Sequence, residues 1–199
     1  MDQEVYELTF IRVLRLLRHK HHKPEVYEQA FLETTSRHRN YVHIFTDGSK
    51  VDEKLAAAAV TSVAPNSPFS CRLRVHCSIY TAELQAVLFA LLRQAYQSQD
   101  RKCIIFSDSL SALQALGKLK TDHPLLIQIQ ELLHTINADQ KDIVFMWVPG
   151  HVGIRGNEAA DRAAKEALDK KNDNRSHAFF GPKTFNCQIC LSNLAERMG

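Results

Sequence analysis

Apolar and polar positions follow two different patterns along this chain, and the pattern changes near residue 40. Over Val5–Arg18, apolar side chains are interleaved with arginines, which predicts a basic amphipathic helix. Such a helix docks on the rest of the chain or on a missing neighbour, or it lies on a membrane surface. The basic run 19–23 before Pro24 is typical of a helix end followed by an exposed loop. We therefore interpret residues 1–40 as an N-terminal extension with a basic amphipathic helix.

From residue 41 the pattern becomes one of short strands and helices. Runs rich in β-branched and aromatic residues predict five strands, at residues 41–46, 55–63, 72–77, 103–106 and 143–148. Helical spacing of apolar residues predicts four helices, at about residues 84–92, 109–119, 124–137 and 157–168. This order predicts an α/β fold with a five-stranded mixed sheet, three antiparallel strands followed by parallel strands, and helices on both faces. We interpret residues 41–170 as one domain and residues 171–199 as a C-terminal tail.

Composition and charge narrow the class of protein. Hydrophobic residues make up 45% and charged residues 24% of the chain, which is the balance of a globular protein with a core. The net charge of +3 permits nucleic-acid binding without arguing for it. The five cysteines form no disulfide framework, the N-terminus has no secretory pattern, and no apolar run approaches membrane-spanning length. We expect an intracellular protein with no membrane partner, and the sequence does not separate cytoplasm from nucleus.

Four acidic residues fall where ligands gather in an α/β sheet. Asp47 follows the first predicted strand and Asp108 follows the fourth. Glu83 lies one helical turn before Val87 on the buried face of its helix, and Asp161 lies in the first turns of the last helix. Each acid alone has an ordinary structural explanation, but together we expect the four carboxylates to converge on one edge of the sheet. Their mutual repulsion and their oxygen ligands favour Mg²⁺, or Mn²⁺ as a substitute.

A glycine-rich stretch after the fifth predicted strand carries the remaining candidates. His151 lies between Gly150 and Gly153, on a loop that leads into the last helix. A loop histidine beside a metal cluster can carry a proton near neutral pH. Asn157 is expected to cap the last helix and to orient Asp161.

These motifs, in this order, resemble those of the type 1 RNase H family, and in particular the RNase H domains of non-LTR retrotransposon polyproteins. The matching segments are Phe45–Lys50, Thr81–Leu84, Ser107–Ser109 and Gly150–Asp161, within residues 41–168. The resemblance implies an RNase H-like fold and an endoribonuclease that hydrolyses the RNA strand of RNA–DNA hybrids by two-metal-ion catalysis. The products would carry 5′-phosphate and 3′-hydroxyl ends.

The resemblance also assigns roles to individual residues. It implies that two Mg²⁺ ions are held by four carboxylates, those of Asp47, Glu83, Asp108 and Asp161. It implies that His151 is a catalytic group that assists turnover. Further residues of the same segments are expected to contact the substrate, namely Gly48, Ser49, Tyr80, Ser109 and Asn157. The expected partners are the RNA–DNA hybrid and, if the chain is part of a polyprotein, its reverse transcriptase domain.

The chain departs from cellular members of the family at two places. Those members carry asparagines just before the helix glutamate, where Ile79 and Tyr80 stand here. They also often insert a basic protrusion where this chain has only Gly117–Thr121. Both departures predict weak binding of the hybrid by this domain alone.

Three alternatives to a hybrid-cutting enzyme are considered. A catalytically weak or silent hybrid-binding module derived from a retroelement is disfavoured because all four acids are present. Another nuclease or a transposase of the same fold is disfavoured because it would lack the His151 loop. An architectural fragment would act through the N-terminal helix. Separately, the pair Cys187 and Cys190 is either two unrelated cysteines or half of a zinc site shared with another segment.

Overall fold

The structure is a computed structural model that describes residues 23–52, 55–62, 68–73, 77–96, 98–118 and 120–169. By its contacts the chain divides into residues 1–168 and 169–199, and the fold described is that of the first unit. The predicted basic helix at Val5–Arg18, and Cys187 and Cys190 of the predicted tail, lie outside the described residues.

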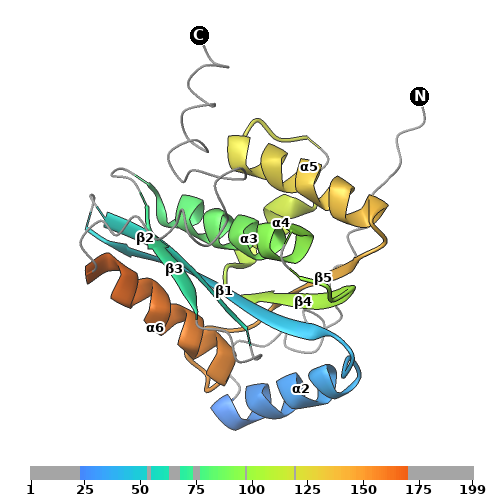
Figure 1. Cartoon of the computed structure of the whole chain (residues 1–199). Helices are drawn as coiled ribbons and strands as arrows, with labels where there is room; N and C mark the ends of the chain where they lie inside the picture. The colour runs from blue at the N-terminus through green and yellow to red at the C-terminus, as the bar shows by residue number, and fades with distance from the viewer. Residues whose placement is uncertain are drawn as a thin grey trace. The chain divides into compact units, whose positions relative to one another are not determined.

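The described residues form one five-stranded sheet in the order β3-β2-β1-β4-β5 (Figure 1). The strands are β1 (Val42–Val51), β2 (Leu55–Ser62), β3 (Phe69–Arg72), β4 (Lys102–Ser107) and β5 (Asp142–Trp147). The first three pair antiparallel, whereas β1 with β4 and β4 with β5 pair parallel. The predicted mixed sheet is therefore confirmed.

Helices cover both faces of the sheet, as predicted (Figure 1). On one face lie α3 (Ile79–Tyr96), α4 (Leu110–Leu116) and α5 (Pro124–Ala138). On the other lie α2 (Pro24–Ser36) and α6 (Arg155–Asp169). The interface of α6 with β2 is built of small side chains, since Ala59 packs with Ala163 and Ala164 in one buried cluster. Within the described part of the chain, no helix combines the length and hydropathy needed to cross a bilayer.

The helix α2 stands where the sequence predicts an exposed loop. Pro24 is its first residue rather than the mark of a helix end, and this position suits proline because its N–H would lack a partner anyway. The ring of Phe31 lies 6.2 Å from that of Phe45 and 5.2 Å from that of Phe106, centroid to centroid. The helix α2 therefore packs on the aromatic side chains of β1 and β4.

Three predicted boundaries were wrong. The first strand was predicted to end at residue 46 but continues to Val51, so Asp47 lies inside it. The third strand is Phe69–Arg72 rather than 72–77, because Phe69 pairs with Val60 and packs its ring edge-on against Phe89 at 5.2 Å. The last helix begins at Arg155, two residues before the predicted start.

Candidate active site

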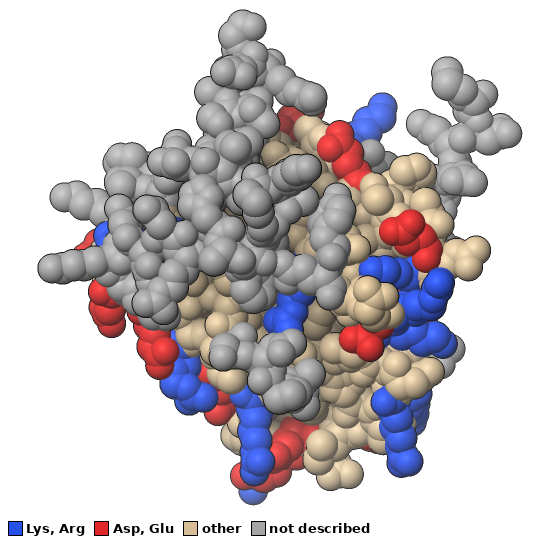
Figure 2. Space-filling model, in the orientation of Figure 1, with Lys and Arg blue, Asp and Glu red and all other residues tan. Residues whose placement is uncertain are grey.

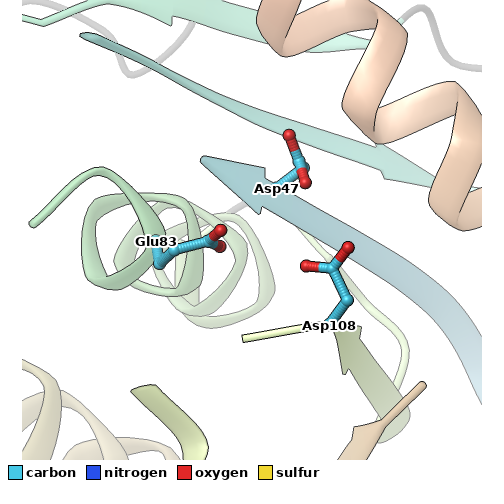
Figure 3. Close-up of side chains that lie close together, drawn as sticks. All are labelled: Asp47, Glu83 and Asp108. Atoms are coloured by element: carbon cyan, nitrogen blue, oxygen red, sulfur yellow. The ribbon is translucent and has the colours of Figure 1, made fainter. Parts of the chain in front are cut away.

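Three of the four predicted carboxylates meet at one place. Ligand oxygens of Asp47, Glu83 and Asp108 all lie within 4.8 Å of one another. Figure 3 shows the three side chains directed toward a common point from β1, from α3 and from the residue after β4. The expected meeting of acids is therefore observed for these three, although only Asp108 lies at the end of a strand.

The sheet pairing explains how Asp47 and Asp108 come to face one another. The parallel ladder between β1 and β4 ends at the pair Thr46 and Ser107, so the next residue of each strand is an acid. Beyond that point β1 continues, paired with β2 alone. The two carboxylates therefore lie side by side where the ladder stops.

The approach of α3 brings Glu83 to the same place. A Cβ atom on Gly48 would lie 2.6 Å from the backbone nitrogen of Glu83 and 2.8 Å from the carbonyl carbon of Ala82. Real Cβ atoms do not come that close to backbone, so only glycine lets α3 cross β1 at this height. The backbone of Gly48 also hydrogen-bonds the Glu83 carboxylate, which lowers the pKa of Glu83 against larger opposing effects.

Burial and mutual repulsion dominate the electrostatics of these acids. Desolvation, followed by the charges of Asp108 and Asp161, raises the pKa of Asp47 to about 8. Desolvation, followed by the charges of Asp47 and Asp108, raises the pKa of Glu83 to about 9. Desolvation also raises the pKa of Asp108. Lys165 lowers the pKa of Asp47 and His151 lowers that of Asp108, but burial and the repulsion between the acids outweigh both effects.

Two oxygens of the cluster are buried without any hydrogen-bond partner. These are Oδ2 of Asp47 and Oε2 of Glu83. A buried carboxylate oxygen without a partner carries a large desolvation penalty, which a bound cation would remove. The donor set contains only oxygen, which suits a hard divalent cation such as Mg²⁺ or Mn²⁺. The residues present therefore fit a divalent metal, while nothing in them selects one ion.

Asp161, the fourth predicted acid, does not belong to this group of three. Its carboxylate pairs with Nζ of Lys165, four residues later on α6, at 2.8 Å. Its charge nevertheless raises the pKa of both Asp47 and Asp108, so it lies within electrostatic reach of the cluster. The expected convergence of four acids is thus only partly met, because Lys165 competes for the fourth.

The loop that carries His151 closes over Asp108. Nε1 of Trp147 donates to the backbone oxygen of Asp108 at 3.0 Å. At Gly150 a Cβ atom would lie only 2.8 Å from Oδ2 of Asp108, so a glycine permits the close approach. His151 itself is exposed, with a positive φ of 58°, and its charge lowers the pKa of Asp108. His151 therefore lies next to the acids, as predicted.

Asn157 does not cap the last helix, contrary to the prediction. It is the third residue of α6, is 2% exposed, and its Nδ2 donates to Oδ2 of Asp108 at 3.2 Å. This hydrogen bond helps to lower the pKa of Asp108 against its burial. The sequence contained one sign of this position, the four-residue spacing to Asp161, which places both residues on one helix face.

The other predicted substrate contacts differ in exposure. Gly48 and Ser49 are buried in β1, the latter 8% exposed. Tyr80 in the first turn of α3 and Ser109 before α4 are half-buried. The ring of Tyr80 meets that of His123 edge-on at 5.6 Å, a contact that the sequence did not suggest.

Comparisons with known proteins identify the family and the fold. Residues 39–169 match the family model described as RNase H. Three curated relatives are Pol polyproteins of equine infectious anemia virus, from strain Wyoming and isolates 1369 and CL22. Each is 34% identical over 129 residues, which is 62% of this chain and 10% of the relative. The chain thus spans about a tenth of the length of the curated relatives it matches.

Solved structures also share the fold, and we describe one of them. It is that of RNase H1 from the halophilic archaeon Halobacterium salinarum NRC-1. The match covers 65% of this chain and 98% of that one, with a TM-score of 0.51 and 24% sequence identity.

Proposed function

This chain belongs to the RNase H family, and on that premise we propose that it is an endoribonuclease that hydrolyses the RNA strand of RNA–DNA hybrids, leaving 5′-phosphate and 3′-hydroxyl ends. Membership of the family supports hybrid ribonuclease activity in general. The predicted relation to retroelement polyproteins is confirmed for a retrovirus. The particular closeness to non-LTR retrotransposons stays a prediction.

One observation carries this proposal: the carboxylates of Asp47, Glu83 and Asp108 lie together, and one buried oxygen each of Asp47 and Glu83 has no hydrogen-bond partner among the described residues. We propose that these carboxylates, with Asp161, hold two Mg²⁺ ions, for which Mn²⁺ can substitute. Such ions, when bound, supply an activated water and stabilise the leaving oxygen of an in-line phosphoryl displacement. The raised pKa values of the metal-free acids support this proposal, since charges that repel one another are the ones a cation stabilises.

The protein's own residues would prepare the site. Asn157 fixes the orientation of the Asp108 carboxylate through its hydrogen bond to Oδ2. Asp161 would act as a ligand while Lys165, which pairs with it, places a positive charge beside the site. We propose that His151 carries a proton on a ring nitrogen during turnover, from its exposed position on the loop next to Asp108.

Substrate contacts are proposed for the five residues predicted from the sequence. Tyr80 and Ser109 are half-buried and can touch the hybrid directly, whereas Gly48, Ser49 and Asn157 would act mainly through the backbone or through the acids. Basic and acidic side chains are interspersed on the face of the molecule shown in Figure 2. With a net charge of +3, this supports weak and salt-sensitive binding.

We also propose the division of the chain and its wider setting. Residues 41–170 would be the catalytic domain, flanked by extensions 1–40 and 171–199. Helix α2 belongs to the first extension and packs on the sheet through Phe31. The relatives that match are polyproteins, which supports a setting in which a reverse transcriptase domain of the same polyprotein is a partner. An intracellular location agrees with the nucleic-acid substrate.

The experiment is cleavage of a hybrid labelled on its RNA strand, with Mg²⁺, Mn²⁺, Ca²⁺ or EDTA, beside an RNA duplex and a DNA duplex of the same sequence. We expect Mg²⁺- or Mn²⁺-dependent cutting of the hybrid alone. Hybrid binding without cutting in either metal would favour the silent hybrid-binding module instead. Cutting of the DNA duplex would favour a different nuclease of the same fold.

A further inference from the structure

Glu158, in the first turn of α6, touches the loop of residues 149–154 that carries His151. Its Oε1 accepts a hydrogen bond of 2.9 Å from the backbone N–H of Gly153. Its own backbone N–H donates to the carbonyl oxygen of Ile154 at 3.1 Å. The same residue thus binds the loop by its side chain and by its backbone, at two consecutive positions.

The middle of this loop has little else to hold it. His151 has a φ of 58° and Gly153 a φ of 88°, and the left-handed region is unfavourable for a residue with a side chain such as His151. A Cβ atom added at Gly153 would meet nothing within 4 Å, and the residue is exposed, so the side-chain direction there is open. A conformation that is strained at His151 and unpacked at Gly153 persists only if other contacts fix it.

The two ends of the loop are fixed in different ways. Gly150 lies tight against the Asp108 carboxylate, and Ile154 is buried, 3% exposed. Between them, His151 and Gly153 are exposed. Among the hydrogen bonds described for this loop, the one to Glu158 falls within the exposed part. It is made to a charged acceptor, which is the stronger kind of hydrogen bond.

We propose that Glu158 is a positioning residue that holds the His151 loop closed over Asp108, an inference that rests on the proposed function for its catalytic consequence. Helix α6 then controls two parts of the site. Asn157 orients the Asp108 carboxylate, and Glu158, its neighbour in sequence, sets the height of the loop above that carboxylate. One rigid helix thereby fixes the position of His151 relative to the acid beside it.

A purely structural role for Glu158 makes a different set of predictions. An acid in the first turn of a helix also stabilises the helix by its interaction with the macrodipole. That effect acts on folding and is independent of whether residue 151 is a histidine. The positioning role acts through His151, so it must disappear when His151 is absent.

The kinetic test uses Glu158→Ala and Glu158→Gln, each alone and combined with His151→Ala. We expect Glu158→Ala to lower kcat about three- to tenfold with little change in KM for the hybrid, since only the loop geometry is lost. Glu158→Gln keeps an acceptor oxygen and should recover most of the loss. In the His151→Ala background, Glu158→Ala should have no further effect. The matched control is Glu166→Ala, which removes an exposed acid from the same helix away from the loop.

A second measurement works without substrate. Hydrogen exchange of the Gly153 amide and ¹⁵N relaxation of residues 150–153, in the intact chain, should show faster exchange and greater motion in Glu158→Ala than in the wild type or Glu166→Ala. Unchanged exchange and motion would overturn the proposal, as would an equal loss of kcat with and without His151. If the wild type fails to cut hybrid, the proposed function fails, whereas the amide measurement still decides whether Glu158 holds the loop.

Discussion

Asn157 on α6 donates its side-chain amide to Asp108, 49 residues earlier in the chain, at 3.2 Å. The bond joins the end of β4 to the first turn of α6 across the candidate metal site. It satisfies one oxygen of a carboxylate that burial and the charge of Asp161 destabilise. Asp108 thus follows strand β4, accepts a hydrogen bond from Asn157 of α6 and lies against Gly150 of the loop that carries His151.

Asp108→Asn is expected to abolish cleavage of the hybrid while the fold remains intact. The substitution removes one charged ligand, so metal binding weakens, but an amide oxygen is still present to accept from Asn157. It also relieves repulsion from Asp161 and the other acids, so the melting temperature without divalent cation should hold or rise. Cleavage of labelled hybrid at saturating Mg²⁺ and a thermal melt in EDTA measure the two effects. Retained turnover would contradict the four-acid site.

His151→Ala is expected to slow turnover without abolishing it. A positioned general acid or base contributes about 10²–10⁴-fold, and the bound cations provide the larger electrostatic contribution. Single-turnover rates of the variant should therefore stay measurable under conditions in which Asp108→Asn shows none. Equal losses in the two variants would mean that His151 does more than assist.

The stability of the metal-free protein should fall as pH rises. The pKa values of Asp47 and Glu83 are raised in the folded state to about 8 and about 9. The folded protein therefore keeps protons that the unfolded chain loses above about pH 4. The stability that these groups contribute is fully present below about pH 4, falls as pH rises above that value, and is gone above about pH 9. We expect the free energy of unfolding in EDTA to drop by at least about 2 kcal/mol between pH 4 and pH 9.

Urea unfolding at a series of pH values, with EDTA or with Mg²⁺, measures this dependence. Added Mg²⁺ should restore stability most at the alkaline end, where both carboxylates are charged. In the control Asp47→Asn, one of the two groups no longer titrates and the pH dependence should be shallower. A flat profile in EDTA for the wild type would contradict the raised pKa values.

Phe31→Ala should destabilise the domain by about 1–3 kcal/mol, because the ring of Phe31 lies against Phe45 and Phe106 on the sheet. The neighbouring Leu32 is 53% exposed on the same helix, so Leu32→Ala is the matched control and should stay within about 0.5 kcal/mol of the wild type. Chemical unfolding of the three proteins measures the difference. Equal stability of the Phe31→Ala and Leu32→Ala proteins would show that α2 is not part of the folded unit.

Replacing Ile79 and Tyr80 by asparagines should tighten binding of the hybrid by about 1–2 kcal/mol, if two neutral hydrogen bonds form to minor-groove groups. Ile79 is 47% exposed and offers no polar atom at that position. Binding is measured across a salt series with Ca²⁺ in place of Mg²⁺, so that the substrate is not cut. The substitution also removes the edge-on contact of Tyr80 with His123, so a thermal melt must accompany the binding data. Unchanged affinity would mean that these positions do not contact the hybrid.

Sequence patterns predicted the sheet and the acids because both depend on local signals. Runs of β-branched and aromatic residues marked four of the five strands closely and misplaced the third, and the predicted strand ends pointed to Asp47 and Asp108 even though β1 continues past Asp47. The true signal at Asp47 is the end of pairing with β4, which depends on a partner strand about 60 residues away and is invisible in a single stretch of sequence.

The features that sequence could not give depend on tertiary contacts. A proline such as Pro24 is compatible both with a loop after a helix and with the first position of a new helix. The contacts of Phe31 with Phe45 and Phe106, which stabilise α2 on the sheet, are tertiary and cannot be read from the local sequence. Asparagine is a common helix N-cap residue, but α6 starts two residues before Asn157, and the side chain of Asn157 donates to Asp108 instead. The pairing of Asp161 with Lys165 follows from their four-residue spacing on a helix, a signal that the sequence does carry.

Gly48 gives a different view of how this chain tolerates mutation. Every charged member of the site could exchange for an amide of nearly the same shape and leave the backbone where it is. An added methyl group at Gly48 would instead collide with the α3 backbone at Ala82 and Glu83, and the helix would have to lift away from the sheet. The position with the least freedom to vary around this site is thus one that carries no functional group. Beyond its backbone hydrogen bond to Glu83, what it contributes is the absence of a side chain.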